Sequence, residues 1–164
     1  MARRPILTWP DPRLTESCAT VPQVTDAVRG LSEDLLDTMY AAPGRGLAAP
    51  QVGEMVCLFV MDTTWKEGTP TPRVFVNPVI EVASSEIAEA EEGCLSIPGI
   101  LANVRRPASV RLRWTNLDGG EASETFHGFA ATCVQHELDH LDGIVTFDRV
   151  DPAQRQALVA RYAG

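Results

Sequence analysis

The alternation of hydrophobic and polar positions predicts three helices along the chain. Apolar residues recur at helical spacing over residues 25–42 and over residues 126–141, and each run carries a continuous apolar stripe. The pair Asp151-Pro152 predicts the start of a third helix that runs to about Arg161. Buried or alternating apolar residues predict strands over residues 55–61, 73–82, 110–114 and 144–147.

The order of these elements predicts the fold class. Strands and helices do not alternate as regular βαβ units, so we expect an α+β fold with antiparallel β-sheets packed around the helix at residues 126–141. Asn77-Pro78 interrupts the second strand, because proline cannot donate a ladder hydrogen bond. Residues 5–24 are rich in proline and predict an extended arm. At 164 residues the chain can bury a real core, and we expect one domain over residues 1–164.

Charge and composition exclude some classes of partner. The chain has 14 basic and 22 acidic residues and a net charge of −8, which argues against nucleic acid or an anionic membrane surface as a main partner. No apolar run approaches the length of a membrane span, and the basic start lacks the apolar run of a signal peptide, so we expect a cytoplasmic protein. Without secretion, the four cysteines are expected to be free thiols or a metal thiolate.

Residues 135–140 read Gln-His-Glu-Leu-Asp-His and place an H-E-x-x-H motif inside the predicted helix. Histidines four residues apart lie on one helical face, so the imidazoles of His136 and His140 can reach a single metal ion. Glu137 lies beside them, where its carboxylate can address a water molecule on the metal. Three ionisable groups next to an apolar stripe are costly to bury unless they are paired or bind metal, which favours a metal site over a solvated face.

A catalytic metal site of this kind needs a third protein ligand. No glutamate follows Glu137 and no histidine follows His140, so Asp148 and Asp151 are the downstream candidates. Cys133 lies on the same helix as His140, about 10 Å away along the axis at 1.5 Å per residue. This separation favours a packing role for Cys133.

Cys94 is the stronger upstream candidate. Gly93 precedes it and Ser96 follows it, so this tight segment can present a thiolate to a metal from an adjacent strand. A lone cysteine is often only a small buried hydrophobe, but the two histidines on the helix favour a ligand here. Of the acidic residues just before it, only Glu92 is expected to be more than part of a solvated face.

Three segments together resemble the peptide deformylases. They are Gly44-Arg45-Gly46-Leu47-Ala48-Ala49-Pro50-Gln51, Glu92-Gly93-Cys94-Leu95-Ser96 and Gln135-His136-Glu137-Leu138-Asp139-His140, in the order and spacing of that family. The likeness covers almost the whole chain, and three motifs in order are far more specific than any one of them. The resemblance implies an enzyme that removes the formyl group from N-formylmethionyl peptides of newly made proteins and releases formate.

The resemblance also implies the metal ligands and the metal. Cys94, His136 and His140 would hold one divalent ion. In the family this ion is Fe²⁺ in cells, and Zn²⁺ or Ni²⁺ often occupies the site after purification. Glu137 would act as general base and then as general acid.

The remaining roles implied by the resemblance concern the substrate, an N-formylmethionyl peptide or nascent chain. The side-chain amide of Gln51 and the backbone N–H of Leu95 would stabilise the developing oxyanion. Gly46 would help to bind the substrate backbone, and we place Arg45 and Glu92 with it as substrate-binding residues.

Two positions depart from the family pattern. Arg45 replaces the usual aliphatic residue between two glycines, near the pocket for the methionine side chain. Leu101 stands where many members have an arginine near the peptide backbone, a role that Arg105 or Arg106 would have to take over. Longer members carry a basic C-terminal extension suited to the ribosome, whereas this sequence ends soon after its last predicted helix, so ribosome docking is not predicted. We expect a monomer.

Two other functions fit parts of the same pattern. A small H-E-x-x-H metallopeptidase would use Asp148 or Asp151 as its third ligand. A non-enzymatic, metal-stabilised domain that binds peptide N-termini would need neither Gln51 nor Glu137.

Overall fold

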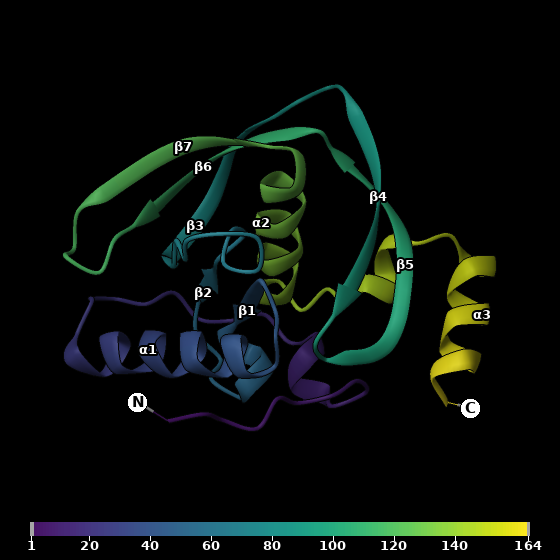
Figure 1. Cartoon of the computed structure of the whole chain (residues 1–164), viewed down its shortest axis with the longest axis horizontal. Coiled ribbons are helices and arrows are strands. Elements are labelled where there is room, and N and C mark those ends of the chain that lie inside the picture. The colour runs from purple at the N-terminus through teal and green to yellow at the C-terminus, as the bar shows by residue number, and fades with distance from the viewer. Residues whose placement is uncertain (1, 164) are drawn as a thin grey trace.

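The structure of the chain, a computed structural model, describes residues 2–163 and contains two antiparallel sheets within that range (Figure 1). The larger sheet has the strand order β1-β2-β3-β6-β7, and the smaller sheet pairs β4 with β5. The strands are β1 Gly46–Ala48, β2 Leu58–Met61, β3 Arg73–Ala83, β4 Ile87–Cys94, β5 Ile97–Pro107, β6 Ser109–Thr115 and β7 Glu121–His127. The helices are α1 Asp26–Ala41, α2 Gly128–Leu141 and α3 Pro152–Ala163, with short 3-10 helices η1 Pro12–Thr15, η2 Ala49–Val52 and η3 Thr146–Arg149. The predicted α+β class with antiparallel sheets is confirmed.

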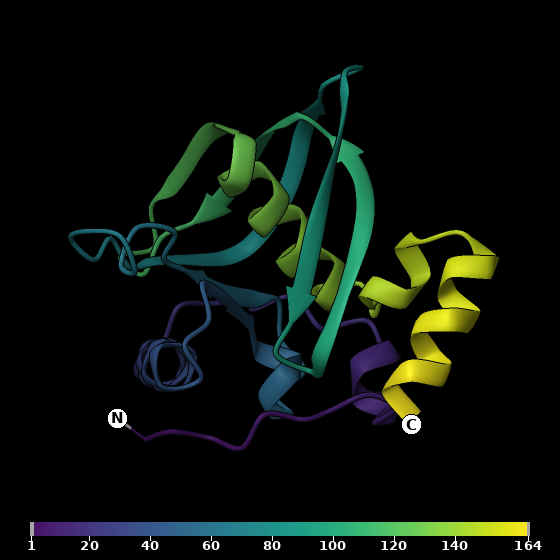
Figure 2. The ribbon, with the colours of Figure 1, turned by 45° about the vertical axis from the view of Figure 1, so that its right-hand side comes forward.

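Helix α2 lies between the two sheets, as Figures 1 and 2 show from two directions. Its apolar residues Ala131, Val134 and Leu141 are buried in one core cluster with the aromatic side chains of the larger sheet. Phe59 and Phe75 stack in this cluster with their ring centroids 4.6 Å apart. Each such side chain contributes roughly 1.5–3 kcal/mol on burial. This packing fixes the rotation of α2 about its axis and therefore the direction of its polar residues.

Two further core clusters hold the outer helices. Leu35 on α1 is fully buried and packs in a cluster with Leu58 of β2. Helix α1 starts where the Thr25 side chain accepts a hydrogen bond from the backbone N–H of Val28. Helices η3 and α3 cover β5 through Phe147 and Leu158 in the third cluster. The smaller sheet is thereby held beside α2.

The predicted interruption at Asn77-Pro78 is a bulge within one continuous strand. The pairing of β3 with β6 shifts register between Val76 and Val79. Asn77 adopts a φ of 50° at this point. Its side-chain amide donates to the carbonyl of Val21 and accepts from the Val21 N–H, both at 2.8 Å. These two bonds tie the N-terminal arm to the bend.

One predicted strand is wrong. Residues 144–147 do not pair with a sheet, because Thr146–Arg149 form the 3-10 helix η3. The Asp148 carboxylate accepts a hydrogen bond from the backbone N–H of Val145 at 3.0 Å and so closes the turn. A short apolar run does not distinguish a strand from a tight helical turn.

Other boundaries differ from the sequence predictions. Helix α2 begins at Gly128, because Phe126 and His127 complete β7. The strands β1, β4 and β5 were not predicted. The four cysteines are free, as predicted. Within residues 2–163, no helix is long and apolar enough to cross a membrane.

The N-terminal arm connects distant parts of the chain. The backbone N–H of Leu7 donates to the Gln51 carbonyl at 2.7 Å, and that of Trp9 donates to the Ser96 carbonyl at 2.9 Å. The hydroxyl of Tyr162 on α3 donates to the Trp9 carbonyl at 2.7 Å. The arm therefore fixes two segments that carry predicted site residues.

We predict that Gly143, just after α2, is the glycine least tolerant of a side chain in this part of the fold. Its φ is 73°, and an added Cβ would lie 2.7 Å from the carbonyl carbon of Thr15. Gly143→Ala should therefore lower the free energy of unfolding by more than about 2 kcal/mol in urea titrations. Gly119→Ala is the matched control, because Gly119 has a φ of 88° but no atom within 4 Å of the added Cβ. Gly119→Ala should lower the free energy of unfolding by about 1 kcal/mol. Equal losses of unfolding free energy in the two variants would contradict the prediction.

Candidate metal centre and active site

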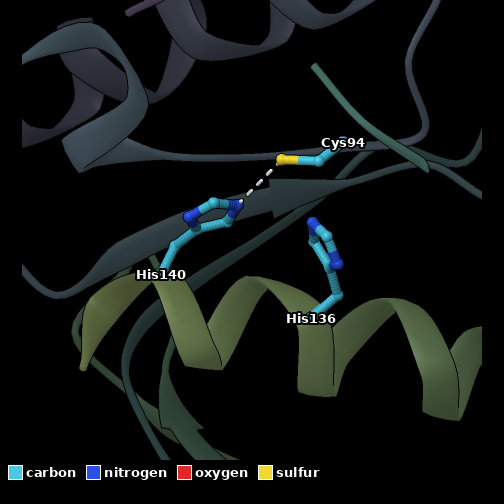
Figure 3. Close-up of side chains that lie close together, drawn as sticks. All are labelled: Cys94, His136 and His140. Atoms are coloured by element: carbon cyan, nitrogen blue, oxygen red, sulfur yellow. Dashed lines mark hydrogen bonds between the residues drawn. The ribbon is translucent and has the colours of Figure 1, made fainter. Parts of the chain in front are cut away.

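Helix α2 and the end of β4 bring three possible metal ligands together (Figure 3). The ligand atoms of Cys94, His136 and His140 all lie within 4.8 Å of one another. The Cys94 Sγ is 3.4 Å from the Nε2 of His140. Donors that bind one ion at about 2.0–2.3 Å in a tetrahedral arrangement are about 3.5 Å apart. The donor spacing therefore fits a single divalent ion.

The other ligand candidates do not join this group. Among residues 2–163, the metal-ligating cluster contains Cys94, and none of Cys133, Asp148 and Asp151. Cys133 is buried in the core cluster and its Sγ approaches the Arg45 carbonyl at 3.8 Å, which matches the packing role predicted for it.

Electrostatics favours a thiolate at Cys94. Burial works to raise the pKa of the thiol, but the neighbouring imidazoles of His140 and His136 outweigh it and lower that pKa well below its ordinary value. A thiolate is the form of cysteine that binds a metal ion. One thiolate and two imidazoles suit Fe²⁺, Zn²⁺ and similar soft or borderline ions.

The buried carboxylate of Glu92 fixes the orientation of the His136 ring. Oε1 of Glu92 accepts a hydrogen bond from Nδ1 of His136 at 3.0 Å, which leaves Nε2 of this ring for the metal. The same carboxylate accepts bonds from Nε and Nη2 of Arg106 at 2.7 and 3.0 Å. Burial works to raise the pKa of Glu92, but the bonds from His136 and Arg106 outweigh it and lower that pKa to about 2. Glu92 is therefore ionised.

The ion pair continues along α2. Nη1 of Arg106 donates to Oδ2 of Asp139 at 2.9 Å, and Arg149 donates to both oxygens of Asp139 at 2.9 and 2.6 Å. Sequence reasoning missed this network. The available signal was the position of Arg106, since Ile100, Ala102, Val104 and Arg106 alternate on the buried side of β5. A charge at an inward position of a strand requires a buried partner.

Two expected roles change with this network. Glu92 borders the cleft, but both of its oxygens are engaged by Arg106 and His136, so it supports a ligand instead of offering a free group to substrate. Arg106 is 6% exposed. Neither Arg105 nor Arg106 lines the cleft, so the suggested replacement of the family arginine by one of them is not supported. Leu101 does line the cleft and is exposed.

Gln51 is held with its amide nitrogen toward the ligand group. Its Oε1 accepts from the backbone N–H of Ala48 at 2.9 Å, and its Nε2 donates to the Ser96 hydroxyl at 3.0 Å. Nε2 also lies 3.8 Å from the Cys94 Sγ. Leu95 follows Cys94 directly and lines the same cleft. Ser96, which orients the Gln51 amide, was quoted in the family motif but was given no role by the sequence.

Glu137 is buried beside the two histidines. Its Oε1 has no hydrogen-bond partner among the described residues. Burial raises the pKa of this carboxyl group, and the imidazoles of His136 and His140 only partly offset the rise. Gly46 lies against it, since a Cβ at Gly46 would come within 2.5 Å of the Glu137 Oε2. An unpaired buried carboxyl group beside metal donors can exchange protons with a reactant.

These groups form the floor of one open cleft with a volume of about 680 Å³. Its walls come from β1 and the preceding turn, from the end of β4 and the start of β5, and from α2 as far as Glu137. The cleft contains Arg45, Gly46 and Gln51 on one side, Cys94 and Leu95 on another, and His136 and Glu137 on α2. The predicted site residues converge here, with His140 behind them as part of the ligand group.

The fold and the site define a class, the H-E-x-x-H metal-site proteins whose third ligand is a cysteine from a neighbouring strand. The sequence model of the polypeptide deformylase family matches residues 3–156. The peptide deformylase of Rhodopseudomonas palustris (strain BisB5) is 48% identical over 164 residues, covering 99% of this chain and 94% of that protein. The peptide deformylase of Afipia carboxidovorans is 46% identical over 162 residues, covering 99% and 95% of the two chains.

Solved structures agree with the sequence comparison. A Synechococcus elongatus peptide deformylase in complex with actinonin superposes with a TM-score of 0.94 at 33% identity, covering 99% of this chain and 89% of that one. A Legionella pneumophila peptide deformylase superposes with a TM-score of 0.92 at 36% identity, covering 99% and 94%. The chain belongs to the polypeptide deformylase family and is an enzyme of the hydrolase class, as the sequence motifs predicted.

We predict that Cys94 is required for tight metal binding. Cys94→Ala removes one of the three donors and should abolish retention of stoichiometric Fe²⁺ or Zn²⁺ through anaerobic dialysis, measured by elemental analysis. Cys133→Ala is the control, because Cys133 lies on the same helix as the histidines but outside the ligand group. Full metal retention by Cys94→Ala would remove Cys94 from the ligand set.

We predict that Glu92 controls metal affinity through His136. Glu92→Gln keeps the shape but weakens the bonds to His136 and Arg106, and should lower metal affinity by about 10- to 100-fold in competition with a chelator. Glu91→Gln, one residue away on β4 and exposed, should leave the affinity unchanged. Equal affinities for the two variants would contradict a supporting role for Glu92.

Proposed function

We propose that the chain hydrolyses the N-formyl group of N-formylmethionyl peptides and nascent chains in the cytoplasm, using one divalent ion held by Cys94, His136 and His140. Fe²⁺ is the native ion in this proposal, and Zn²⁺ or Ni²⁺ can take its place. The observation that supports it is the convergence of three metal donors, the Glu137 carboxyl group and the Gln51 amide on the floor of one cleft.

Cys94, His136 and His140 would hold the ion, which would supply a Lewis acid and bring the pKa of a water molecule toward neutrality. Glu137 would take a proton from the attacking water as the water oxygen adds to the formyl carbon. Glu137 then delivers the proton to the peptide nitrogen as the carbon–nitrogen bond breaks, which gives formate and a free amino terminus. The burial of its Oε1 without a hydrogen-bond partner in residues 2–163 suits a group that must both take and release a proton.

Gln51 and Leu95 act on the formyl oxygen. Negative charge develops on this oxygen only while the formyl carbon is tetrahedral, so donors aimed at it accelerate the reaction. The Gln51 amide is fixed by Ala48 and Ser96 and needs no rearrangement to donate. The backbone N–H of Leu95 is the second donor in this proposal. Removing one such donor typically costs about 10²–10³ in rate.

The alternative functions lose their main support. A metallopeptidase with Asp148 or Asp151 as third ligand requires one of these carboxylates at the metal, and the cluster in the described residues contains neither. Asp148 instead accepts the Val145 N–H. A purely structural metal site has no use for the buried Glu137 or for the oriented Gln51 amide. Both groups therefore favour the enzyme.

We predict that Glu137 carries turnover but not metal binding. Wild-type protein, prepared anaerobically with Fe²⁺, should release formate from formyl-Met-Ala-Ser and nothing from acetyl-Met-Ala-Ser. Glu137→Ala should lose at least about 10²–10⁴ of the rate while its metal content stays at one ion per chain. Formate release by Glu137→Ala at the wild-type rate would show that Glu137 is not the proton-transfer group. Absence of formate with the metal-loaded wild type would overturn the proposed function itself.

A further inference from the structure

One wall of the cleft is built around a charged side chain that the proposed chemistry does not use. Arg45 lies between two glycines just before β1, and its guanidinium pairs with the carboxylate of Glu67. The guanidinium carbon also lies 5.2 Å from the centre of the Phe129 ring, at the start of α2. Arg45 and Phe129 both line the cleft. The pair therefore forms a continuous wall between β1 and α2.

This wall is held in place at its outer end by an ordered loop. The fully buried Asp62 carboxylate accepts backbone bonds from Thr64, Trp65 and Thr71 at 3.0–3.1 Å, which ties the two ends of residues 62–72 together. The Trp65 indole N–H donates to the Gly44 carbonyl at 3.0 Å. Glu67 therefore lies on an ordered loop, and this loop holds the Glu67 carboxylate close to the Arg45 guanidinium.

The inner end of the wall is fixed as well. The Arg45 carbonyl accepts the backbone N–H of Asp62 at 2.9 Å and faces the Cys133 Sγ at 3.8 Å. At the next residue, Gly46, β1 lies so close to Glu137 that there is no room for a side chain larger than a hydrogen atom. A substrate whose formyl group reacts beside Glu137 lies in a cleft that Arg45, Phe129 and Thr132 also line.

We propose that Arg45, braced by Glu67 against Phe129, is a specificity-determining residue that narrows this side of the cleft. The inference rests on the proposed function. The substrate class that fits is an N-formyl peptide whose first side chain is long, unbranched and flexible, such as methionine. An aromatic ring in the same place has to displace the guanidinium from both Glu67 and Phe129. The wall thus selects by shape through a residue that takes no part in bond breaking.

The test compares two peptides within each protein sample. Rates of formate release are measured for formyl-Met-Ala-Ser and formyl-Phe-Ala-Ser with wild type, Arg45→Ala and Glu67→Gln. Arg45→Ala should raise the Phe-to-Met ratio of kcat/KM about tenfold, through a lower KM for the Phe peptide with little change in kcat. Glu67→Gln keeps Arg45 but frees it, and should raise the ratio about threefold. The ratio is independent of the fraction of active enzyme, so a loss of stability alone does not move it.

Glu124→Gln is the matched control. Glu124 holds Arg73 with bonds of 3.0 and 2.8 Å, and the Arg73 guanidinium lies 5.1 Å from the centre of the Phe126 ring. This is the same arrangement of glutamate, arginine and aromatic ring, but Arg73 does not line the cleft. Glu124→Gln should leave the Phe-to-Met ratio of kcat/KM unchanged. A rise as large as that of Glu67→Gln would overturn the inference, because it would reflect general loosening.

The remaining outcomes separate the inference from the function on which it rests. Formate release with an unchanged ratio in Arg45→Ala overturns the role of Arg45 and leaves the deformylase proposal intact. If Arg45→Ala does not fold, Glu67→Gln decides the question alone, because Glu67 is exposed and its replacement removes only a charge. No formate from either peptide with metal-loaded wild type overturns both proposals together.

Discussion

The buried guanidinium of Arg106 is the interaction on which the site depends. It joins Glu92 on β4 to Asp139 on α2, and so connects the smaller sheet to the central helix by charge as well as by packing. A buried charge of this kind is unfavourable unless each partner is satisfied, and loss of one partner leaves the others uncompensated at a cost of roughly 3–5 kcal/mol. Because Glu92 also holds His136, this pairing sets the distance between the strand that carries Cys94 and the helix that carries the two histidines.

The close contact between β1 and α2 imposes a second constraint. Gly46 meets Glu137 where no side chain fits, and this contact keeps Glu137 covered while the cleft stays open on the side of Cys94. The three possible metal ligands, the buried Glu137 carboxyl group and the Gln51 amide thus come from three separate segments of backbone. Each segment is immobilised by groups that do not react, such as Ser96 for Gln51 and Arg106 for Glu92.

The sequence predicts the parts of the protein that depend on local pattern. The helix with His136 and His140 was predictable from its apolar period, and Cys94 from its tight segment and its family motif. The partners of the buried charges were not, because Arg106, Asp139 and Arg149 meet only through tertiary packing. Residues 144–147 were predicted as a strand, whereas Thr146–Arg149 form a 3-10 helix, because so short an apolar run has no period that distinguishes the two. Likewise, Arg45 could be placed near the pocket from its position, but its bond to Glu67 depends on a loop whose shape the sequence does not reveal.

The N-terminal arm has a consequence for the order in which the molecule forms. Leu7 and Trp9 leave the ribosome before Gln51 and Ser96, the residues whose carbonyls they bind. The two backbone bonds of the arm cannot form until these later segments have been made. Contacts between residues so far apart in sequence form slowly, because the intervening chain must first be closed into a loop. The arm can therefore help to align Gln51 with Cys94 only after the segment that carries Ser96 has been made.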